Sequence, residues 1–595
     1  MQEMKEVGLQ IMWNRLLSMA EEQAQTIVRT AFSTAAREAG DLSAGIFLPD
    51  GRMIAQAITG TPGHLNSMAE SVRHFLKKFP EAQMRPGDVF VTNDPWLAAG
   101  HLHDFTVVTP AFQKGRLVAL FGATCHVVDI GGLGLGIEGR EIYHEGLLVP
   151  IMRFMSEGKV NDALLEIVRA NVREPSQVEG DLYALAASND TGVTQLAAMM
   201  DEFSIDSLDE LGSYIIGQSE AAMLEAVGRL PVGTFTNRMV IDGVENAVEL
   251  AATLTISDRN ILLDFAGTSP VSSYGVNVPL CYTHAYATFA VHCVVAPKIP
   301  KNAGSLAPIR VVAPEGCILN ATYPAPVSAR HMIGQMVPDV VLGCLHQVVQ
   351  SGVQAEGTSS VWTLRLSRSA ILSGSQESRS NARAFNVNSF HSGGAGARPT
   401  KDGLSATSFP SGVKNVPVEV TESISPLVFW KKEYRADSGG SGKWRGGLGQ
   451  VIEVENLEQA PFVISATFDR INHPPRGREG GSAGATGRLR LKSGASLKGM
   501  GRQAIPAGEC LVVEFPGGGG YGDPLERDPE FVAKDARAGL VSRVAATEDY
   551  GVVLVDHSAE VDDVATNHLR ARMRQMRENI PAAPSNDPPK PGSGN

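Results

Sequence analysis

The sequence predicts a multi-lobed α+β protein with mixed and antiparallel sheets, a helical lobe and a glycine-rich, β-rich C-terminal part. The chain has 595 residues, which is more than one compact core accommodates, so several lobes are expected. Apolar residues recur at helical spacing in some stretches and form short strand-like runs in others. Glycines away from helix ends are frequent after residue 359, which indicates tight turns and close backbone approach.

The first region expected, residues 1–160, combines helices with hairpins. Apolar spacing predicts a long amphipathic helix over residues 6–37, ending near a glycine suited to a left-handed cap. Residues 46–48 and 53–55 flank a Pro-Asp-Gly turn and predict a hairpin. A second helix is expected over residues 64–79. These elements precede the stretch that carries the candidate site.

The rest of the chain divides by changes in periodicity and composition. Helical spacing dominates at first, strands and helices then alternate, and a glycine-rich β-like part follows. The last residues are rich in Pro, Ser and Gly, which is typical of disorder. The expected regions are a helical lobe (161–230), a central α/β region (231–358), a glycine-rich β region (359–525), a C-terminal helical and strand segment (526–580) and a disordered tail (581–595).

Composition excludes several classes of partner. The formal net charge is -12, so there is no electrostatic footprint for nucleic acid or for an anionic membrane surface. No apolar run is long enough to cross a bilayer, and the N-terminus lacks the basic-then-apolar pattern of a secretory signal. The 6 cysteines are scattered without a CxxC pair, which is typical of reduced, buried side chains. We therefore expect a cytoplasmic protein.

The stretch over residues 89–132 organises the predicted site. Its apolar runs at residues 105–108 and 117–121 are expected to pair as an antiparallel hairpin through the turn at residues 113–115. The start of the first strand would then lie beside the end of the second. The polar residues at these ends are His101, His103, Asp104, His126 and Asp129.

Three of these side chains, His101, Asp104 and His126, predict a metal site. Imidazole with carboxylate suits zinc, manganese or iron, and the lack of nearby paired cysteines argues against a closed structural zinc site. Strand ends are stiff enough to hold such ligands in place. The alternative is that these histidines cap strand ends or lie in turns, as a single histidine usually does.

Other residues are secondary candidates. Asp41 lies at the mouth of a predicted strand, where its carboxylate could reach the site or simply serve the turn. His144 and Glu145 are candidates for proton transfer, with a role in a surface loop as the alternative. Arg330 lies at a predicted helix start, where a cation is not favoured, so we expect it to have an anionic partner and to handle substrate. Cys125 is more consistent with burial in a strand than with a nucleophile.

A series of unusual motifs carries a resemblance to a known family. They are GDLSAGIF, DGRMIAQ, NDPWLAAGHLHDFTVVTP, HVVDIGG, REIYHEGLLVP, PAPVSARH, GGAGARPTKDG, DSGGSGKWRGGLG and GGGGYGDP. Together they resemble the hydantoinase B/oxoprolinase family, in family order and over nearly the whole chain. This family includes the B subunit of ATP-dependent N-methylhydantoinase, the C-terminal half of 5-oxoprolinase and the caprolactamase β subunit. It also includes the corresponding subunits of acetone and acetophenone carboxylases.

The resemblance implies a heteromeric complex with an A-type ATPase subunit of actin-like fold, which binds ATP and phosphorylates the substrate carbonyl oxygen. This chain itself carries no Walker-type lysine motif. The family's metal motif maps onto Asp41, His101, Asp104 and His126. Asp41 enters the ligand set only through this resemblance. His103 and Asp129 become candidates for orienting the ligands.

The function that follows is that of the metal-containing B subunit of an ATP-dependent amidohydrolase acting on cyclic amides of hydantoin or oxoproline type. Phosphorylation removes amide resonance, and a metal can lower the pKa of a bound water. Zinc is the first choice because hydrolysis needs no redox change, with manganese or iron as alternatives. The alternative function is a subunit of an ATP-dependent, biotin-independent ketone carboxylase. A third possibility is a scaffold whose cluster is structural.

Overall fold

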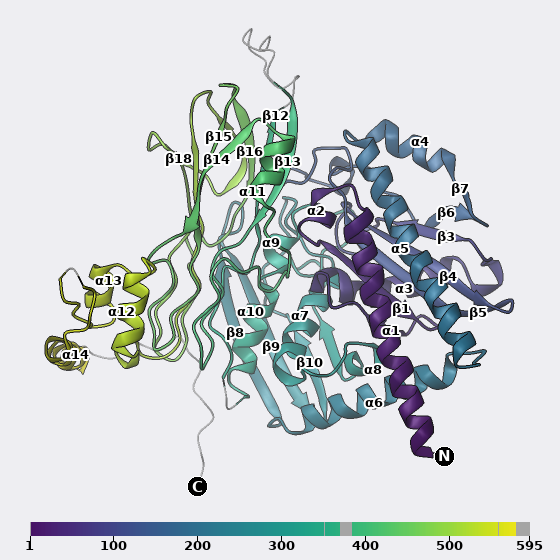
Figure 1. Cartoon of the computed structure of the whole chain (residues 1–595), viewed down its shortest axis with the longest axis horizontal. Helices are drawn as coiled ribbons and strands as arrows, with labels where there is room; N and C mark the ends of the chain where they lie inside the picture. The colour runs from purple at the N-terminus through teal and green to yellow at the C-terminus, as the bar shows by residue number, and fades with distance from the viewer. Residues whose placement is uncertain (1, 350–351, 369–382, 557, 579–595) are drawn as a thin grey trace. The chain divides into compact units, whose positions relative to one another are not determined.

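The computed structural model describes residues 2–349, 352–368, 383–556 and 558–578 (Figure 1). The chain forms two compact units, each assembled from separate segments. Unit 1 comprises Met1–Phe235, Ala251–Val341 and Ser411–Asn415, and unit 2 comprises Thr236–Leu250, Leu342–Pro410 and Val416–Asn595. The finer division into regions stays a prediction, and the tail predicted over 581–595 lies outside the described residues.

A seven-stranded antiparallel sheet forms the centre of unit 1, in the order β2-β1-β5-β4-β3-β6-β7. Its longest pair is the predicted hairpin, confirmed with Asp104 opposite His126 and with Lys114 and Gly115 at positive φ in the turn. The strands are β1 (Leu42–Phe47), β2 (Met53–Gln56), β3 (Val89–Thr92), β4 (Asp104–Gln113), β5 (Arg116–His126), β6 (Met152–Ser156) and β7 (Lys159–Val160).

Helices cover both faces of this sheet, which explains why β4 and β5 are buried almost throughout. Phe121 packs with helices α1 (Gln2–Thr30) and α5 (Pro175–Glu202) on one face. Its neighbour Leu120 points the other way and packs with helix α3 (Pro62–Lys78). The sheet is therefore buried on both sides, and only its strand ends can present polar groups to a site.

The helix predicted over residues 6–37 is interrupted. Helix α1 ends at Thr30, and a short helix α2 (Thr34–Arg37) follows. Ser33 is the reason, because its side chain accepts the backbone N–H of Ala36 as an N-cap and its own N–H donates to buried Asp181. The chain thereby turns toward β1 and brings Asp41 to the start of that strand.

The remaining elements of unit 1 follow the expected alternation, with a helical segment and then a second sheet. The sheet has the order β11-β10-β9-β8, and parts of β8 and β9 belong to unit 2. The helix predicted to start at Arg330 is instead two short helices. The elements are η1 (Glu81–Gln83), η2 (Ile142–His144), α4 (Asp162–Asn171), α6 (Asp209–Gly228), β8 (Gly233–Ile241), β9 (Val248–Ser257), β10 (Asn260–Asp264), α7 (Leu280–Val295), α8 (Ala303–Leu306), β11 (Ile309–Val312), α9 (His331–Gly334) and α10 (Val337–Leu345).

Unit 2 contains two sheets, in the orders β13-β12-β16-β19 and β14-β15-β20-β17-β18. Trp362 lies at their shared core, stacked on Phe468 at 4.4 Å between ring centroids. The strands are β12 (Trp362–Arg368), β13 (Phe385–His391), β14 (Leu427–Tyr434), β15 (Gln450–Asn456), β16 (Phe462–Thr467), β17 (Arg488–Leu491), β18 (Ser496–Leu497), β19 (Met500–Ile505) and β20 (Leu511–Glu514). The helices are α11 (Val418–Ile424), η4 (Pro524–Glu526), α12 (Pro529–Arg537), α13 (Arg543–Glu548) and α14 (Asp563–Glu578).

The glycines of unit 2 lie where backbones meet. A Cβ on Gly518 would lie 2.0 Å from the carbonyl oxygen of Ala395, and one on Gly446 would lie 1.9 Å from that of Gly518. No side chain fits at either position, as predicted from the glycine-rich composition.

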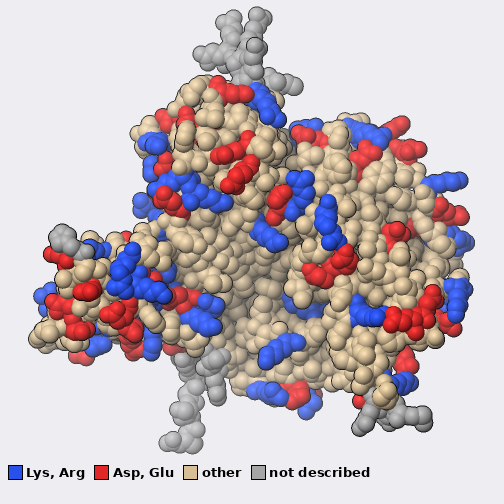
Figure 2. All heavy atoms as spheres, viewed as in Figure 1, with Lys and Arg blue, Asp and Glu red and all other residues tan. Residues whose placement is uncertain are grey.

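Charged side chains of both signs are exposed on the surface (Figure 2). On the face drawn in Figure 2, Lys and Arg side chains are interspersed with Asp and Glu. Within the described residues, no helix combines the length and apolar character needed to cross a membrane.

Candidate metal centre

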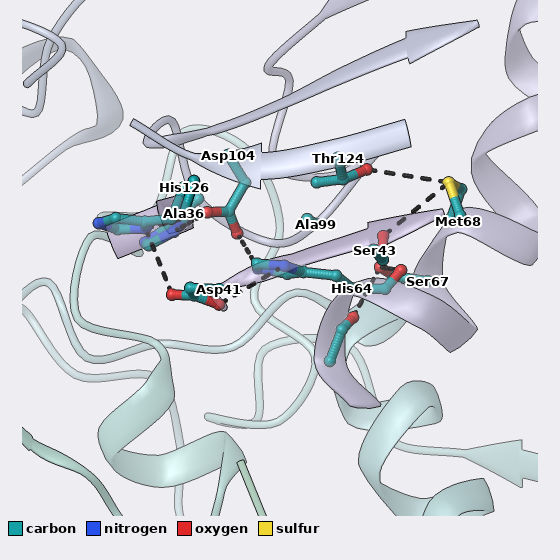
Figure 3. Close-up of polar contacts among 12 residues, drawn as sticks. Ala36, Asp41, Ser43, His64, Ser67, Met68, Ala99, Asp104, Thr124 and His126 are labelled. Atoms are coloured by element: carbon teal, nitrogen blue, oxygen red, sulfur yellow. Dashed lines mark hydrogen bonds and ion pairs between the residues drawn. The ribbon is translucent and has the colours of Figure 1, made fainter. Parts of the chain in front are cut away.

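Three neighbouring strands bring Asp41, Asp104 and His126 to the same edge of the seven-stranded sheet. Asp104 begins β4 and is paired with His126, which ends β5. On the other side of β5, Leu42 of β1 is paired with Cys125, so Asp41 lies next to His126. The backbone N–H of His126 donates to the carbonyl oxygen of Asp41 at 3.0 Å. Figure 3 shows these side chains gathered at one place.

His101 reaches the same place from the loop before β4. Its Nδ1 lies 2.9 Å from the carbonyl oxygen of Ser328, and its Nε2 lies 2.8 Å from Oδ1 of Asp104. A carbonyl oxygen only accepts hydrogen bonds, so Nδ1 carries the hydrogen and Nε2 of the neutral ring presents its lone pair to Asp104. Burial, followed by the charge of Arg330, lowers the pKa of His101 to about 3, which keeps the ring neutral.

One ligand atom from each of His101, Asp104 and His126 lies within 4.8 Å of the others, and all three residues are buried. Nδ1 of His126 lies 3.0 Å from Oδ1 of Asp104, the oxygen that also faces His101. Asp41 is the outlying member, because its Oδ2 is 4.0 Å from Nδ1 of His126. The structure thus brings together the residues that spacing predicted and places Asp41 beside them.

Two hydrogen-bond donors, His64 and Arg330, flank the other oxygen of Asp104. Nε2 of His64, from the first turn of α3, lies 2.8 Å from Oδ2, and the guanidinium of Arg330 contacts the same atom. Burial opposes the charge on Asp104, but His64 and Arg330 hold its pKa well below the ordinary value. Burial likewise opposes protonation of His64, yet the carboxylates of Asp104 and Asp41 raise its pKa.

His64 was not predicted as a site residue. Its Nδ1 lies 3.6 Å from Oδ1 of Asp41, so its ring bridges the two carboxylates, as Figure 3 shows. The only local signal is the Thr-Pro-Gly-His start of a helix, since Thr61 is the N-cap of α3. That signal places His64 in a first helical turn but says nothing of what the turn faces.

Arg330 has the anionic partner that its position predicts, and that partner is Asp104. The guanidinium Nε also donates to the carbonyl oxygen of Ala99 at 2.7 Å, and its central carbon lies 3.9 Å from the ring centroid of Tyr282. A Cβ on Gly100 would lie 2.6 Å from Cδ of Arg330, so glycine is needed for this approach. A role of Arg330 toward substrate stays a prediction.

Arg330→Met is expected to lower the free energy of unfolding by about 3 kcal/mol, because Asp104 would keep its charge in a buried site without the guanidinium that contacts it. Arg330 and Asp104 are 3% and 0% exposed, so solvent cannot compensate. Denaturant unfolding of the two proteins measures the difference. Arg52→Met is the matched control, since Arg52 pairs with Asp50 in an exposed turn. Equal losses in the two variants would contradict the assignment.

Three other predicted residues lie near the ends of β4 and β5, namely His103, Asp129 and Cys125. The ring of His103 is stacked with that of His126, 5.4 Å between centroids. Asp129 is bound to Arg173, whose backbone N–H and guanidinium both donate to it. Cys125 is buried in β5, as expected, and burial raises the pKa of its thiol well above the ordinary value.

His144 and Glu145 adjoin in sequence but differ in environment. His144 is exposed, and its Nδ1 accepts the backbone N–H of Arg140. Glu145 is 1% exposed, and burial raises its pKa to about 8. Its Oε1 accepts the backbone N–H groups of Val327 and Ser328 at 2.7 and 2.9 Å.

The donor set fits a divalent metal. Nε2 of neutral His101 and Oδ1 of Asp104 are both acceptors at 2.8 Å, and such a pair is stable only with a cation to share. Two imidazoles and a carboxylate are the ligands that catalytic zinc sites use. His101, Asp104 and His126 would hold the metal, with Asp41 as the fourth donor.

Comparison with known proteins agrees with the fold and the motifs. The family model for hydantoinase B/oxoprolinase matches residues 5–524. The chain is 28% identical over 592 residues to the putative D-/L-hydantoinase B subunit of Pseudomonas sp. (strain NS671), covering 95% of this chain and 98% of that protein.

Two solved structures share the fold. The ATP-dependent caprolactamase from Pseudomonas jessenii matches with a TM-score of 0.85 and 24% identity, covering 95% of this chain and 99% of that one. Nucleotide-free acetone carboxylase matches with a TM-score of 0.85 and 19% identity, covering 98% of this chain and 84% of that one. Because the family model spans most of the sequence, this chain belongs to the hydantoinase B/oxoprolinase family.

Proposed function

We propose that this protein is the metal-containing B subunit of an ATP-dependent hydrolase of cyclic amides, of hydantoinase or oxoprolinase type. The observation that carries the proposal is the buried cluster of His101, Asp104 and His126 at the sheet edge. Family membership supports it, since a relative that the chain matches over nearly its whole length is named as a hydantoinase B subunit. We propose an A-type ATPase subunit as the partner and place the complex in the cytoplasm.

The proposed chemistry divides between two subunits. In the partner, the γ-phosphoryl group of ATP passes to the amide oxygen, releasing ADP and removing the amide resonance. At the site described here, one water would add to the activated carbon and the ring C–N bond would break, which leaves an acyl phosphate. A second water would then release phosphate and the carboxylate. Each turnover then converts ATP, two waters and the cyclic amide into ADP, phosphate and the ring-opened amino acid.

The residues of this chain would orient the donors and exclude water. A divalent metal supplies Lewis-acid polarisation and lowers the pKa of a bound water. His64 and Arg330 hold Oδ2 of Asp104, which leaves Oδ1 directed at His101 and His126. We propose zinc as the metal, with manganese or iron as alternatives, because nitrogen and oxygen ligands suit all three. His144, Glu145 and Arg330 are the further residues proposed to serve the reaction.

The experiment that tests this function is copurification with the ATPase subunit, followed by assays on hydantoins, 5-oxoproline, lactams and ketones. We expect ADP formation to depend on a cyclic amide, with one ring-opened product for each ADP. Turnover of no cyclic amide would contradict the proposal.

A ketone carboxylase subunit is the second candidate, because acetone carboxylase shares the fold with the same TM-score as caprolactamase. The same site would then hold an enolate-like carbanion equivalent against carbon dioxide. Labelled bicarbonate separates the two functions. Label in the product indicates carboxylation, and an unlabelled ring-opened amino acid indicates hydrolysis.

A further inference from the structure

We propose that Glu145 is a positioning residue that acts on the metal centre through the segment of residues 327–330. This inference rests on the proposed metal site. Glu145 follows η2, and one oxygen of its carboxyl group, Oε1, accepts two successive backbone N–H groups of that segment. Such a pair of bonds ties down a loop that forms no strand or helix at this point.

The segment held by Glu145 supplies two groups to the site. The carbonyl oxygen of Ser328 accepts Nδ1–H of His101 at 2.9 Å, which sets the tautomer and the ring orientation of that ligand. Two residues later, Arg330 binds Oδ2 of Asp104. A shift of the segment would therefore misplace the partners of both His101 and Asp104.

The side chain of Glu145 lies in a narrow slot beside Gly139 and Gly275. A Cβ on Gly139 would lie 3.1 Å from Cγ of Glu145, and one on Gly275 would lie 3.1 Å from Oε1. Gly275 itself accepts the backbone N–H of Ala329 at 2.6 Å, so the slot and the segment are joined. Neither glycine position has room for a side chain without movement of the carboxyl group.

This geometry requires an acceptor at Oε1 and does not require a negative charge. Among the described residues, Oε2 has no hydrogen-bond partner, and both N–H groups go to the other oxygen. Glutamine keeps an acceptor oxygen in the same place and removes the titrating proton. Comparison of Glu145→Gln with Glu145→Ala therefore separates positioning from proton transfer.

The experiment measures Zn²⁺ affinity by competition with a chromophoric chelator, and turnover and its pH profile in the assembled complex. We expect Glu145→Ala to weaken Zn²⁺ binding about 10-fold to 100-fold, the range usual for residues that orient metal ligands. Glu145→Gln is expected to bind Zn²⁺ like the parent and to keep its pH profile. Glu141→Ala, an exposed acid in the same loop, is the control and should match the parent.

Three outcomes would overturn the inference. Glu145→Gln could retain Zn²⁺ and lose turnover, or lose the limb of the pH profile near pH 8, which would assign proton transfer instead. Glu145→Ala could bind Zn²⁺ as tightly as the parent. Glu145→Gln could also lose Zn²⁺ affinity as severely as the alanine variant. If the parent itself binds no Zn²⁺, Mn²⁺ or Fe²⁺, the proposed function fails, which distinguishes that failure from these three.

Discussion

Asp104→Asn is expected to weaken metal binding more than about 100-fold, beyond the loss usual for residues that only orient ligands. Turnover of the cyclic amide should fall by about three orders of magnitude, because a metal contributes several kcal/mol to such a step. Oδ1 faces His101 and His126, while Oδ2 faces His64 and Arg330. An amide replaces one of these oxygens with an NH₂ group. That NH₂ group would face either the metal ligands or the donors of His64 and Arg330. Metal analysis and steady-state kinetics measure both effects.

Asp88→Asn is the matched control for this variant. Asp88 is equally inaccessible, at 2% exposed, but it accepts the backbone N–H groups of Arg85 and Glu157 in a turn before β3. It should lose some stability and keep both metal and turnover. An Asp104→Asn protein that folds, retains its metal and turns over normally would remove Asp104 from the ligand set.

Removing the metal is expected to uncouple ATP use from ring opening. In the proposed mechanism the partner activates the substrate, so ADP should still form in the presence of a cyclic amide. Ring-opened product should fall by about three orders of magnitude, because the metal contributes several kcal/mol to this step. The activated amide would return to the starting amide as phosphate is lost to water. The ratio of ADP to product, expected to be one in the intact complex, should therefore rise steeply.

The metal must be removed without depleting the Mg²⁺ that ATP needs. This chain is treated alone with a zinc-selective chelator, dialysed, and only then assembled with its partner in buffer containing Mg²⁺. Restoring Zn²⁺ should return product formation and the original ratio. Ring opening that proceeds at the parent rate after verified metal removal would exclude a metal step in this chain.

The sequence predicts those site residues that lie close to one another along the chain. His101, Asp104 and His126 lie at the open end of a hairpin. The turn at its other end, Lys114-Gly115, has positive φ angles of 50° and 79°. Such a turn and the apolar runs beside it fix the register, and the register sets which side chains meet.

The remaining members come from long-range packing, which spacing does not reveal. Arg330 is 226 residues from Asp104 and reaches it only because the segment after Pro324 packs onto the loop before β4. His64 depends on where helix α3 meets the sheet edge. Asp41 lies beside His126 through the pairing of β1 with β5, and the family resemblance supplied what local sequence could not.

The fold shows the same division. The strands of the hairpin at residues 104–126 follow the predicted apolar runs. The break after α1 depends on Ser33, whose N–H meets the distant Asp181. The segments that make up each unit are not contiguous, so a division of the sequence into consecutive regions does not reveal the units.

Anomalous diffraction from crystals of the active, metal-replete complex tests the proposed metal centre most directly. We expect one ion about 2.0–2.2 Å from a nitrogen of His101, a nitrogen of His126 and an oxygen of Asp104. Asp41 should complete the set. A fully active complex whose only bound transition metal lies elsewhere would contradict the proposed centre.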